Sequence, residues 1–446
     1  MAVANLKSEI EIVREAAHPL EDAERNYDPL INMIGEARFC LIGEATHGTH
    51  EFYRDRAEIT KRLIKEKGFK AVAVEADWPD AFRINRYVRG MSDDRNADEA
   101  LAGFKRFPTW MWRNTVVVDF VEWLREYNES LPDYSAKVSF YGLDLYSLYT
   151  SIEAVLSYLN KVDPEAASRA RYRYSCFEHF RENTQAYGYA ANFGMTDTCE
   201  REVLGQLLEL RRRAAEYASR DGRIAQDEFF FAEQNARLIK NAEAYYRTMF
   251  RGRVDSWNLR DRHMAETLDA LVNHLSAEGQ TAKVAVWEHN SHLGDARATY
   301  MAAQGELNVG QLVRQKYGRE AVLVGLTTYT GTVTAASDWD GPAERKRVRP
   351  ALAESYEHLF HKVGLENFLL TMREQTSTVL RRPRLERAIG VIYLPQTERQ
   401  SHYFDASLSE QFDAVIHFDE TSALEPLERY ALWETGEPPE TFPTGV

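Results

Sequence analysis

The sequence predicts an α/β protein: a mostly parallel central sheet flanked by helices, with a large helical insertion over the carboxyl edge of the strands. Two observations lead to this fold class. Short apolar runs of strand composition recur along the chain, and most are separated by stretches long enough for a crossover helix. Between about residues 150 and 275, no strand-like run interrupts a long helical signal. We therefore expect a single domain over residues 1–446, with residues 150–275 as an insertion within it.

The first part of the chain alternates helical and strand-like patterns. Residues 8–35 carry a mixed apolar face and are expected to form one or two helices that cover the sheet. The first strand is expected at residues 37–42, and a helical pattern begins soon after it. A second apolar run, residues 69–77, ends in two carboxylates before a proline. Residues 80–130 again have a helical pattern, so this spacing suits a parallel crossover.

Five further apolar runs complete the predicted sheet. They cover residues 137–144, 283–287, 321–326, 388–393 and 414–418. Between the third and the fourth of these runs, residues 329–350 contain Trp339 and several basic residues. A connection of that length is expected to be a lid or a loop that contacts the substrate.

Polar residues cluster in the turn that follows the first predicted strand. In an open α/β sheet, ligands bind outside the carboxyl ends of the strands, so this turn is a candidate site. Gly43 and Gly48 bracket the turn and allow a close approach of the backbone. Glu44, His47 and His50 supply groups that transfer protons or bind ligands.

The helix after this turn carries an arginine within its apolar face. Phe52, Arg56, Ile59 and Leu63 share one face, at offsets of four, three and four residues. Because Arg56 lies near the N-terminal end of the helix, its guanidinium is expected to point along the sheet edge toward the turn.

Chemically active side chains follow four of the predicted strands, at the point where each strand ends. In a parallel sheet these ends meet at one edge, so the groups are expected to lie in one pocket beneath the insertion. In chain order they are Glu44 and His47, Glu75 and Asp77, Asp144, and Glu288, His289 and His292. The residues expected to bind the substrate are Asp77, Asp144, Glu288 and Trp339.

These groups suit hydrolysis by an activated water molecule. A neutral histidine is a good general base, and a carboxylate bonded to its other nitrogen fixes the tautomer. His47 with either Glu75 or Glu44 fits such a pair. A developing oxyanion also needs fixed donors. The available ones are Arg56, His289 and His292.

Direct attack by water is favoured over a covalent acyl-enzyme. The chain contains no GxSxG motif, and no serine has comparable support as a nucleophile. Asn290 or Ser291 is expected to cap the helix that follows the strand at residues 283–287.

Length and charge narrow the function classes. With 446 residues, 44% of them hydrophobic, the chain can bury a large core. The formal net charge is −14 and no basic block occurs, so nucleic-acid binding is disfavoured. No signal-peptide pattern and no apolar run of about 18 residues is present, so we expect a cytoplasmic protein without membrane contact. The three cysteines, Cys40, Cys176 and Cys199, are too scattered to predict a disulfide framework, and Cys40 is expected to be structural.

Two motifs also resemble a known family. The run GEATHG at residues 43–48, followed by EFY at residues 51–53, resembles the signature of the erythromycin esterase family, and WEHNSH at residues 287–292 is similar to a second family motif. The resemblance extends to about residue 421. It implies an ester hydrolase that opens a macrolactone with histidine-activated water. The positions that match the family's functional groups are Glu44, His47, Arg56, Glu75, His289 and His292. The family pattern often has serine where this chain has Ala45, which leaves the base untouched but alters a neighbouring hydrogen bond.

Three functions compete at this stage. The first is hydrolysis of a carboxylic ester or lactone without a cofactor, with macrolides as one substrate class; the family also includes succinoglycan biosynthesis proteins, so acyl or glycan-linked substrates are credible. The second is a metal-dependent hydrolase, because His47, His289 and His292 are potential ligands, although no HExxH spacing supports it. The third is a non-catalytic metal- or haem-binding protein, since the fold resembles that of haem-binding lipoproteins; the missing signal peptide counts against it.

Overall fold

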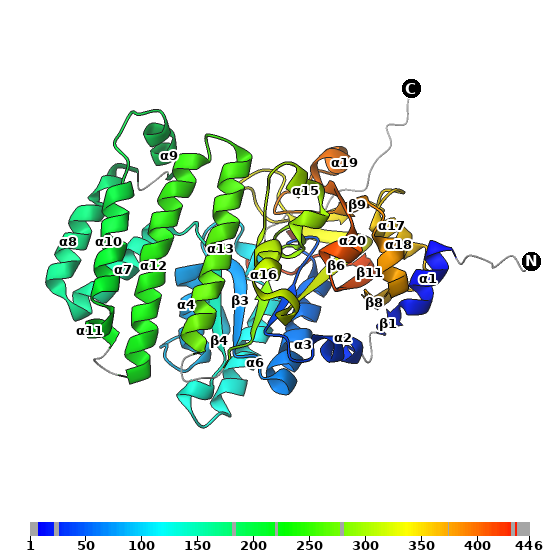
Figure 1. Ribbon diagram of the computed structural model, residues 1–446, viewed down its shortest axis with the longest axis horizontal. Helices are drawn as coiled ribbons and strands as arrows, with labels where there is room; N and C mark the ends of the chain where they lie inside the picture. The colour runs from blue at the N-terminus through cyan, green and yellow to red at the C-terminus, as the bar shows by residue number, and fades with distance from the viewer. Residues whose placement is uncertain are drawn as a thin grey trace, which may run out of the picture.

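The computed structural model describes residues 8–21, 26–180, 184–218, 222–276, 281–372, 374–429 and 433–434, and it is built around a nine-stranded sheet (Figure 1). The strands in the described residues are β1 (His18–Pro19), β2 (Phe39–Ile42), β3 (Ala71–Asp77), β4 (Ser139–Asp144), β5 (Val284–Trp287), β6 (Ala321–Ala335), β7 (Glu344–Val348), β8 (Asn367–Thr371), β9 (Arg384–Arg387), β10 (Tyr403–Ala406) and β11 (Ala414–Thr421). The strands β9 and β10 form a separate, two-stranded antiparallel sheet.

The central sheet is mostly parallel. Its strand order is β1-β8-β11-β6-β2-β5-β3-β4, and β7 pairs with the second half of β6. The six strands from β11 to β4 run parallel to one another, whereas β1, β8 and β7 are antiparallel to their neighbours. The predicted fold class is therefore confirmed.

Both faces of the sheet are buried, as the continuous apolar runs indicated. On β2, Phe39 and Leu41 belong to one buried cluster, while Cys40 and Ile42 belong to the other. In the register of the sheet, Ile42 lies opposite Trp287 on β5, and Trp287 lies opposite Val74 on β3. Because the strands end at nearly the same level, the turns that follow them lie at one edge.

Helices cover both faces and one side of the sheet (Figure 1). The helices before the insertion are α1 (Glu9–Ala16), α2 (Asp28–Ile34), α3 (His50–Lys67), α4 (Trp78–Val88), α5 (Ala97–Leu101) and α6 (Thr115–Glu129). Those after it are α14 (Asn290–Leu293), α15 (Tyr300–Ala303), α16 (Val309–Tyr317), α17 (Tyr356–His361), α18 (Glu374–Leu380), α19 (Glu398–Ser401) and α20 (Leu408–Gln411). The helices α2, α3 and α6 pack on the face that carries Cys40, and α13, α16 and α17 pack on the other.

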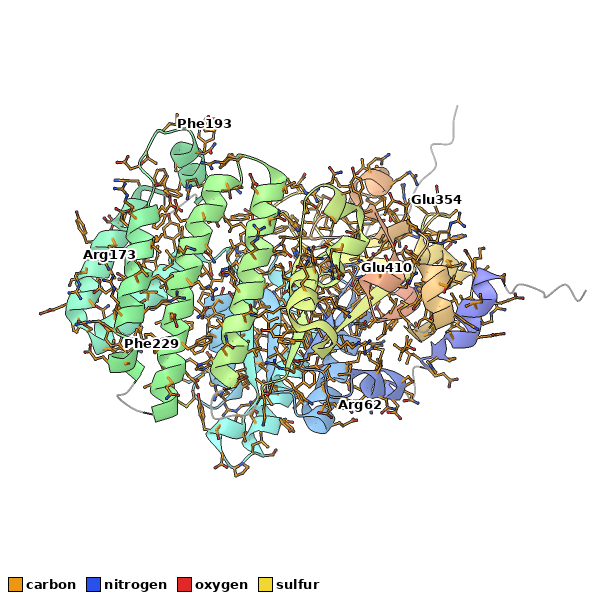
Figure 2. The ribbon with its side chains drawn as sticks, in the orientation of Figure 1. Arg62, Arg173, Phe193, Phe229, Glu354 and Glu410 are labelled. Carbon is orange, nitrogen blue, oxygen red and sulfur yellow. A yellow bond between two sulfur atoms is a disulfide. The ribbon has the colours of Figure 1, made fainter. Side chains whose placement is uncertain are left out.

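The insertion between β4 and β5 is helical throughout its described residues. It consists of α7 (Leu148–Val162), α8 (Pro164–Tyr174), α9 (Thr184–Asn192), α10 (Glu200–Arg212), α11 (Ala214–Ala218), α12 (Gly222–Thr248) and α13 (Arg253–Leu275). Figure 1 shows these helices, in green, standing beside the edge strand β4. One buried cluster joins Leu207 of α10 and Ile239 of α12 to Val286 of the sheet, and side chains fill the space between these layers (Figure 2). We therefore propose that the insertion folds together with the sheet as one domain.

Two segments differ from the sequence-based expectation. Residues 388–393 form no strand and make only isolated bridges, from Ile389 to Thr46 and from Ile392 to Ala336. Their apolar side chains cover the carboxyl edge of the sheet instead of entering it, and β8, which was not predicted, takes a place in the sheet. The expected loop at residues 329–350 is mostly a hairpin, because β6 runs on to Ala335 and pairs with β7.

A disulfide joins Cys176 to Cys199, which the sequence analysis did not predict. The two cysteines are 23 residues apart and are brought together by the packing of the insertion, which no local spacing reveals. Cys40 is buried in β2 with a free thiol. Disulfides persist mainly in oxidising compartments, so this pair counts against the cytoplasmic location, which stays a prediction. Among the described helices, none combines the length and apolar character that a membrane crossing requires.

Candidate active site

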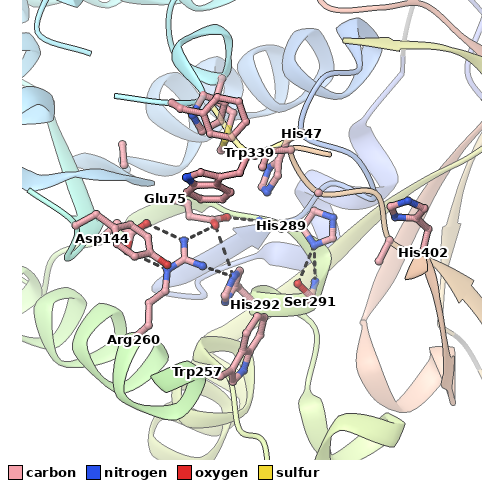
Figure 3. Close-up of a pocket in the computed structure, with 18 of the residues that line it drawn as sticks. His47, Glu75, Asp144, Trp257, Arg260, His289, Ser291, His292, Trp339 and His402 are labelled. Carbon is pink, nitrogen blue, oxygen red and sulfur yellow. Dashed lines mark hydrogen bonds and ion pairs between the residues drawn. The ribbon is translucent and has the colours of Figure 1, made fainter. Parts of the chain in front are cut away.

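A cavity lies at the carboxyl ends of β2, β3, β4 and β5, where the functional groups were expected (Figure 3). Its volume is about 560 Å³, within the usual range for a small-molecule site. Polar side chains from the strand ends line it together with aromatic side chains from residues 104–112, from α13, from the hairpin turn that carries Trp339, and from residues 403–404.

The turn between β2 and α3 holds His47 against Glu44. Gly43 and Gly48 allow this close packing, because a Cβ atom would collide with a side chain of α14 at the first position and with the backbone of β6 at the second. The Nδ1 atom of His47 lies 2.9 Å from Oε1 of Glu44, and both residues are buried. An ionised carboxylate only accepts hydrogen bonds, so Nδ1 carries the proton and Nε2 keeps its lone pair.

Arg56 lies behind Glu44 and does not reach the cavity. Its Nη2 atom donates to Oε2 of Glu44 over 2.8 Å, and its guanidinium carbon lies 4.4 Å from the ring centroid of Tyr53. The side chain points toward the turn, as its place on α3 indicated, yet it is fully buried and does not line the cavity. In this arrangement Arg56 holds Glu44 in place. It does not line the cavity, so it cannot make the expected contact with a developing oxyanion.

Arg260, from the insertion, joins the ends of β3 and β4. Its Nη2 atom donates to Glu75 over 2.8 Å and to Asp144 over 2.7 Å, and its Nε atom donates to Asp144 over 3.0 Å (Figure 3). Burial alone raises the pKa of Glu75, but the charges of His292 and Arg260 outweigh it and hold this pKa well below its usual range. Burial also raises the pKa of Asp144, but the charge of Arg260 outweighs burial, so this pKa is lowered. Both carboxylates are therefore ionised at neutral pH.

His292 is held between two carboxylates and an aromatic ring. Its Nδ1 atom lies 2.9 Å from Asp261, and its ring stacks on Trp257 with centroids 4.5 Å apart. Burial lowers the pKa of His292, but Asp261 and Glu75 outweigh burial and raise it. When His292 is neutral, its Nε2 atom accepts from Arg260 at 3.1 Å. When it is protonated, Nε2–H faces Glu75 at 3.5 Å.

His289 is a neutral histidine at the start of α14. Its Nδ1 atom accepts from the backbone N–H of Ser291 at 3.2 Å and lies 2.8 Å from the Ser291 hydroxyl, so the ring proton is on Nε2. Burial and the nearby His47 lower the pKa of His289 to about 3. Its backbone N–H donates to Glu75 over 2.9 Å, and its ring lies 4.8 Å from that of His47. His289 is thus a neutral donor beside the His47 base.

The sequence pattern of the erythromycin esterase family matches residues 64–421, which is most of the chain. The chain belongs to the erythromycin esterase family. This match begins after the first motif, at residues 43–53, but a relative from Escherichia coli extends across it. That relative, an erythromycin esterase type II, is 22% identical over 423 residues, covering 92% of this chain and 95% of its own length. Membership of the family supports a hydrolase.

Solved structures share the fold of this erythromycin esterase family member. A succinoglycan biosynthesis protein superposes with a TM-score of 0.73 at 21% identity, covering 95% of this chain and all of its own. A protein from Bacillus cereus gives 0.74 at 22% identity with the same coverage. A histidine-to-asparagine mutant of an erythromycin esterase, in its open conformation, gives 0.65 at 17% identity, covering 93% of this chain and 97% of its own. At these identities the likeness establishes the fold alone.

Most of the residues predicted for the site lie in the cavity, and three do not. Those that line it are His47, Glu75, Asp77, Asp144, His289, His292 and Trp339. Glu44 and Arg56 lie behind His47, as described above. Glu288 was expected to bind the substrate but is buried, does not line the cavity, and has neither carboxylate oxygen hydrogen-bonded within the described residues. Burial raises its pKa well above the usual range, so it is protonated.

The sequence analysis did not name several residues that line the cavity. They include Ser291, Trp257, Arg260 and Arg106, and Asp261 behind the cavity holds His292. Arg260 and Asp261 lie in a charged stretch at the end of the insertion, far in sequence from every strand end. Two adjacent charges on a helix more often face water, so only the fold could reveal that both are buried here.

Replacing Arg260 with methionine is expected to lower the free energy of unfolding by about 3–5 kcal/mol at pH 7, because the buried Asp144 then loses its ion pair and Glu75 keeps only its ion-pair contact with His292. Both carboxylates have lowered pKa values in the folded state. Their stabilising effect is present above their ordinary pKa values of about 4 and is lost as the pH falls through the folded values. Without Arg260, burial raises the pKa of both carboxylates, so they take up protons as the pH falls and the cost of the substitution should shrink between pH 7 and pH 3.5 in denaturant titrations.

The control for this measurement is Arg237→Met, which removes an ion pair to the half-exposed Glu266. Such a pair is worth less than about 1 kcal/mol, so this variant should be close to the parent at both pH values. An equal loss at pH 7 and pH 3.5 for Arg260→Met would show that lost packing, not lost charge, causes the destabilisation.

Proposed function

We propose that this chain hydrolyses a carboxylic ester or lactone by direct attack of a water molecule that His47 activates. The observation that carries the proposal is the orientation of His47. Glu44 holds its Nδ1–H, Arg56 holds Glu44, and Nε2 makes no hydrogen bond within the described residues while the ring lines the cavity. This arrangement presents the basic nitrogen to a water molecule and stabilises the imidazolium that forms.

The proposed reaction uses the remaining groups as follows. His47 Nε2 takes a proton from water as the water oxygen bonds to the carbonyl carbon, and negative charge moves to the carbonyl oxygen. His289, as a neutral N–H donor, and the guanidinium of Arg260 stabilise that charge, and His292 adds a positive charge in its protonated form. The carbon–oxygen bond to the leaving group then breaks, and the imidazolium returns its proton to the leaving oxygen. The products are a carboxylic acid and an alcohol, which remain one molecule if the substrate is a lactone.

Hydrolysis assays test this proposal. The purified chain is presented with nitrophenyl esters, aliphatic lactones and macrolactones, and acid release is followed by pH-stat and mass spectrometry. We expect turnover of at least one ester or lactone, with label from H₂¹⁸O in the acid product. The related proteins named above make macrolactones and acylated glycans the first candidates. The absence of hydrolysis throughout this panel would remove the support for an esterase.

Ser291 offers the competing nucleophile, because its hydroxyl lies 2.8 Å from His289 in the same cavity. This pair resembles a serine–histidine dyad, but the lowered pKa of His289, about 3, makes it a weak base. Its Nδ1 atom also accepts a backbone N–H, as a helix cap does. We therefore expect Ser291→Ala to keep kcat within about threefold of the parent, far above the loss caused by a missing nucleophile.

The check is a comparison of initial rates together with intact-mass analysis after rapid quenching. No acyl adduct should appear on the parent enzyme. A loss of about 10³-fold in Ser291→Ala, with an acyl-serine adduct on the parent, would replace the water mechanism by a covalent one.

Hydrolysis is also expected to need no metal ion. In the described part of the chain, no group of three or more histidine, cysteine, aspartate or glutamate side chains is arranged to hold one. Arg260, which contacts both Glu75 and His292, would repel a cation there. We expect activity to survive prolonged dialysis against a chelator. Loss of activity on dialysis and its recovery with one particular metal would favour the metal-dependent alternative.

A further inference from the structure

The charged side chains that line the cavity differ in whether they have an ion-pair partner. Arg106 pairs with Asp77 at 2.9 Å, Arg253 pairs with Glu306 at 3.0 Å, and Arg260 pairs with the strand-end carboxylates. Every arginine that lines the cavity therefore has an acidic partner. Asp80 also lines the cavity, but no hydrogen bond or ion pair of this carboxylate is found among the described residues. Within the described residues, Asp80 is thus an acidic group of the cavity without an ion-pair partner.

Asp77 adds an unused acceptor beside Asp80. It is 5% exposed and lines the cavity; Oδ2 accepts from Arg106, whereas Oδ1 is buried without a hydrogen-bond partner. Asp77 is the N-cap residue of α4, yet its side chain makes no capping hydrogen bond. Helix capping therefore does not account for this unpaired oxygen, and a buried oxygen without a hydrogen bond is costly unless a ligand or water satisfies it.

The two carboxylates lie close enough to influence each other. Burial first, and then the charge of Asp77, raise the pKa of Asp80 to about 7. The charges of Arg106, Arg83 and Lys105 act in the opposite direction, but burial and Asp77 outweigh them. An incoming cation would stabilise the ionised form of Asp80 and complete the charge balance of this end of the cavity.

Aromatic rings also line the cavity that contains Asp77 and Asp80. Phe107 and Trp339 pack against each other with centroids 5.0 Å apart, and both line the cavity. Trp339 is 60% exposed, although large aromatic side chains are usually buried. Aromatic faces and incompletely paired carboxylates in one cavity are a combination that binds ammonium groups, through cation–π attraction and ion pairing.

We propose that Asp77 and Asp80, together with the rings of Phe107 and Trp339, form a subsite for an ammonium group, so that the preferred ester of this chain is cationic. This inference rests on the proposed esterase function. It adds the charge of the substrate and the residues that select it. Neutral hydrogen-bond donors, such as sugar hydroxyls, are the competing occupants, and the test separates them from a cation because it uses a quaternary ammonium group that donates no hydrogen bond.

The experiment compares two nitrophenyl esters of the same shape. One is the ester of trimethylammonio-butanoic acid, and the other is its carbon isostere, in which a tert-butyl group replaces the trimethylammonium group. Each kcat/KM is divided by the rate of the same ester in hydroxide, which removes differences in intrinsic reactivity. The parent enzyme should prefer the cationic ester by about tenfold, the effect of one partly screened charge pair. Asp80→Asn should reduce this preference to about twofold or less.

Glu306→Gln is the matched control. It removes the same charge from the same cavity, but at a carboxylate that Arg253 already pairs. The cationic preference should persist in this variant. No preference in the parent, a preference that survives in Asp80→Asn, or an equal loss in Glu306→Gln would each overturn the ammonium subsite, the last by showing only a general field effect.

Binding of the corresponding amides separates this inference from the hydrolase proposal. Calorimetry with the trimethylammonio amide and its tert-butyl counterpart requires no catalysis. The parent should bind the cationic amide about tenfold more tightly, and Asp80→Asn should lose that difference. Tighter binding without hydrolysis of either ester would uphold the subsite while the esterase proposal fails, whereas equal binding of the two amides would overturn the subsite.

Discussion

Replacing His47 with alanine is expected to lower kcat/KM by about 10²–10⁴-fold on any ester or lactone that the parent hydrolyses, the usual effect of a positioned general base. The fold should persist, because His47 lies in a turn at the cavity wall and packs in neither of the two large buried clusters. Initial rates across pH 5 to 9 provide the measurement, with circular dichroism to confirm the fold. The parent profile should rise with the deprotonation of a histidine, and this ascending limb should be missing from the residual activity of the variant.

His50→Ala is the control for this variant. His50 begins α3 three residues further along, but it does not line the cavity. It should keep both the rate and the ascending limb of the pH profile. Near-parental turnover by His47→Ala would show that His47 is not the base, and a matching loss in His50→Ala would point to disturbance of the turn as the cause.

The six parallel strands of the sheet and the position of the cavity could be predicted from local patterns alone. The runs that form β2, β3, β4 and β5 are apolar, short and followed by polar groups, and parallel pairing brings their ends to one edge whatever the details of packing. That is why Glu75, Asp144 and His289 meet although more than 200 residues separate the first from the last. Buried side chains recur every two residues along a strand and every 3.6 residues along a helix, so the sequence reveals such elements.

Contacts between distant elements could not be predicted in the same way. Arg56 was placed correctly on the buried face of α3, but helix periodicity does not tell which acceptor lies at the end of a long side chain, and here it is Glu44. Arg260 and Asp261 become site residues only because α13 returns to the sheet edge. The apolar run at residues 388–393 has the composition of a strand, yet tertiary packing places it along the cavity.

The sequence analysis also left two carboxylates as partners for His47, and the structure distinguishes their surroundings. Glu44 is 2.9 Å from His47 Nδ1. Glu75 is bonded instead to Arg260 and to the backbone of His289, and it affects His47 only through its charge. Loss of Glu75 should therefore disturb the donors of the site, while loss of Glu44 should disturb the base itself.

Replacing Glu44 with glutamine is consequently expected to lower kcat/KM by about as much as the loss of His47, roughly 10²–10⁴-fold. The reason lies in Arg56, which only donates hydrogen bonds. It will hold the amide oxygen of the new side chain and turn the amide NH₂ toward His47. The Nδ1 atom must then accept, so the ring proton moves to Nε2 and the lone pair that activates water is lost. The double variant with His47→Ala should be hardly slower than either single variant.

Arg56 supplies the test of this tautomer argument. In Arg56→Met the carboxylate of Glu44 remains, so the tautomer and the pH profile should be retained, although an unpaired buried charge should cost about 3–5 kcal/mol of stability. In the combined Glu44→Gln and Arg56→Met variant, no donor fixes the amide, its oxygen is free to accept from His47 Nδ1–H, and kcat/KM should recover by about tenfold or more over Glu44→Gln alone. Nitrogen-15 shifts of the His47 ring report the tautomer directly, with Nε2 protonated in Glu44→Gln and Nδ1 protonated in the parent. If instead the combined variant is the slower one and the ring tautomer is the same in all three proteins, Glu44 acts on His47 through its charge and not through the position of the proton.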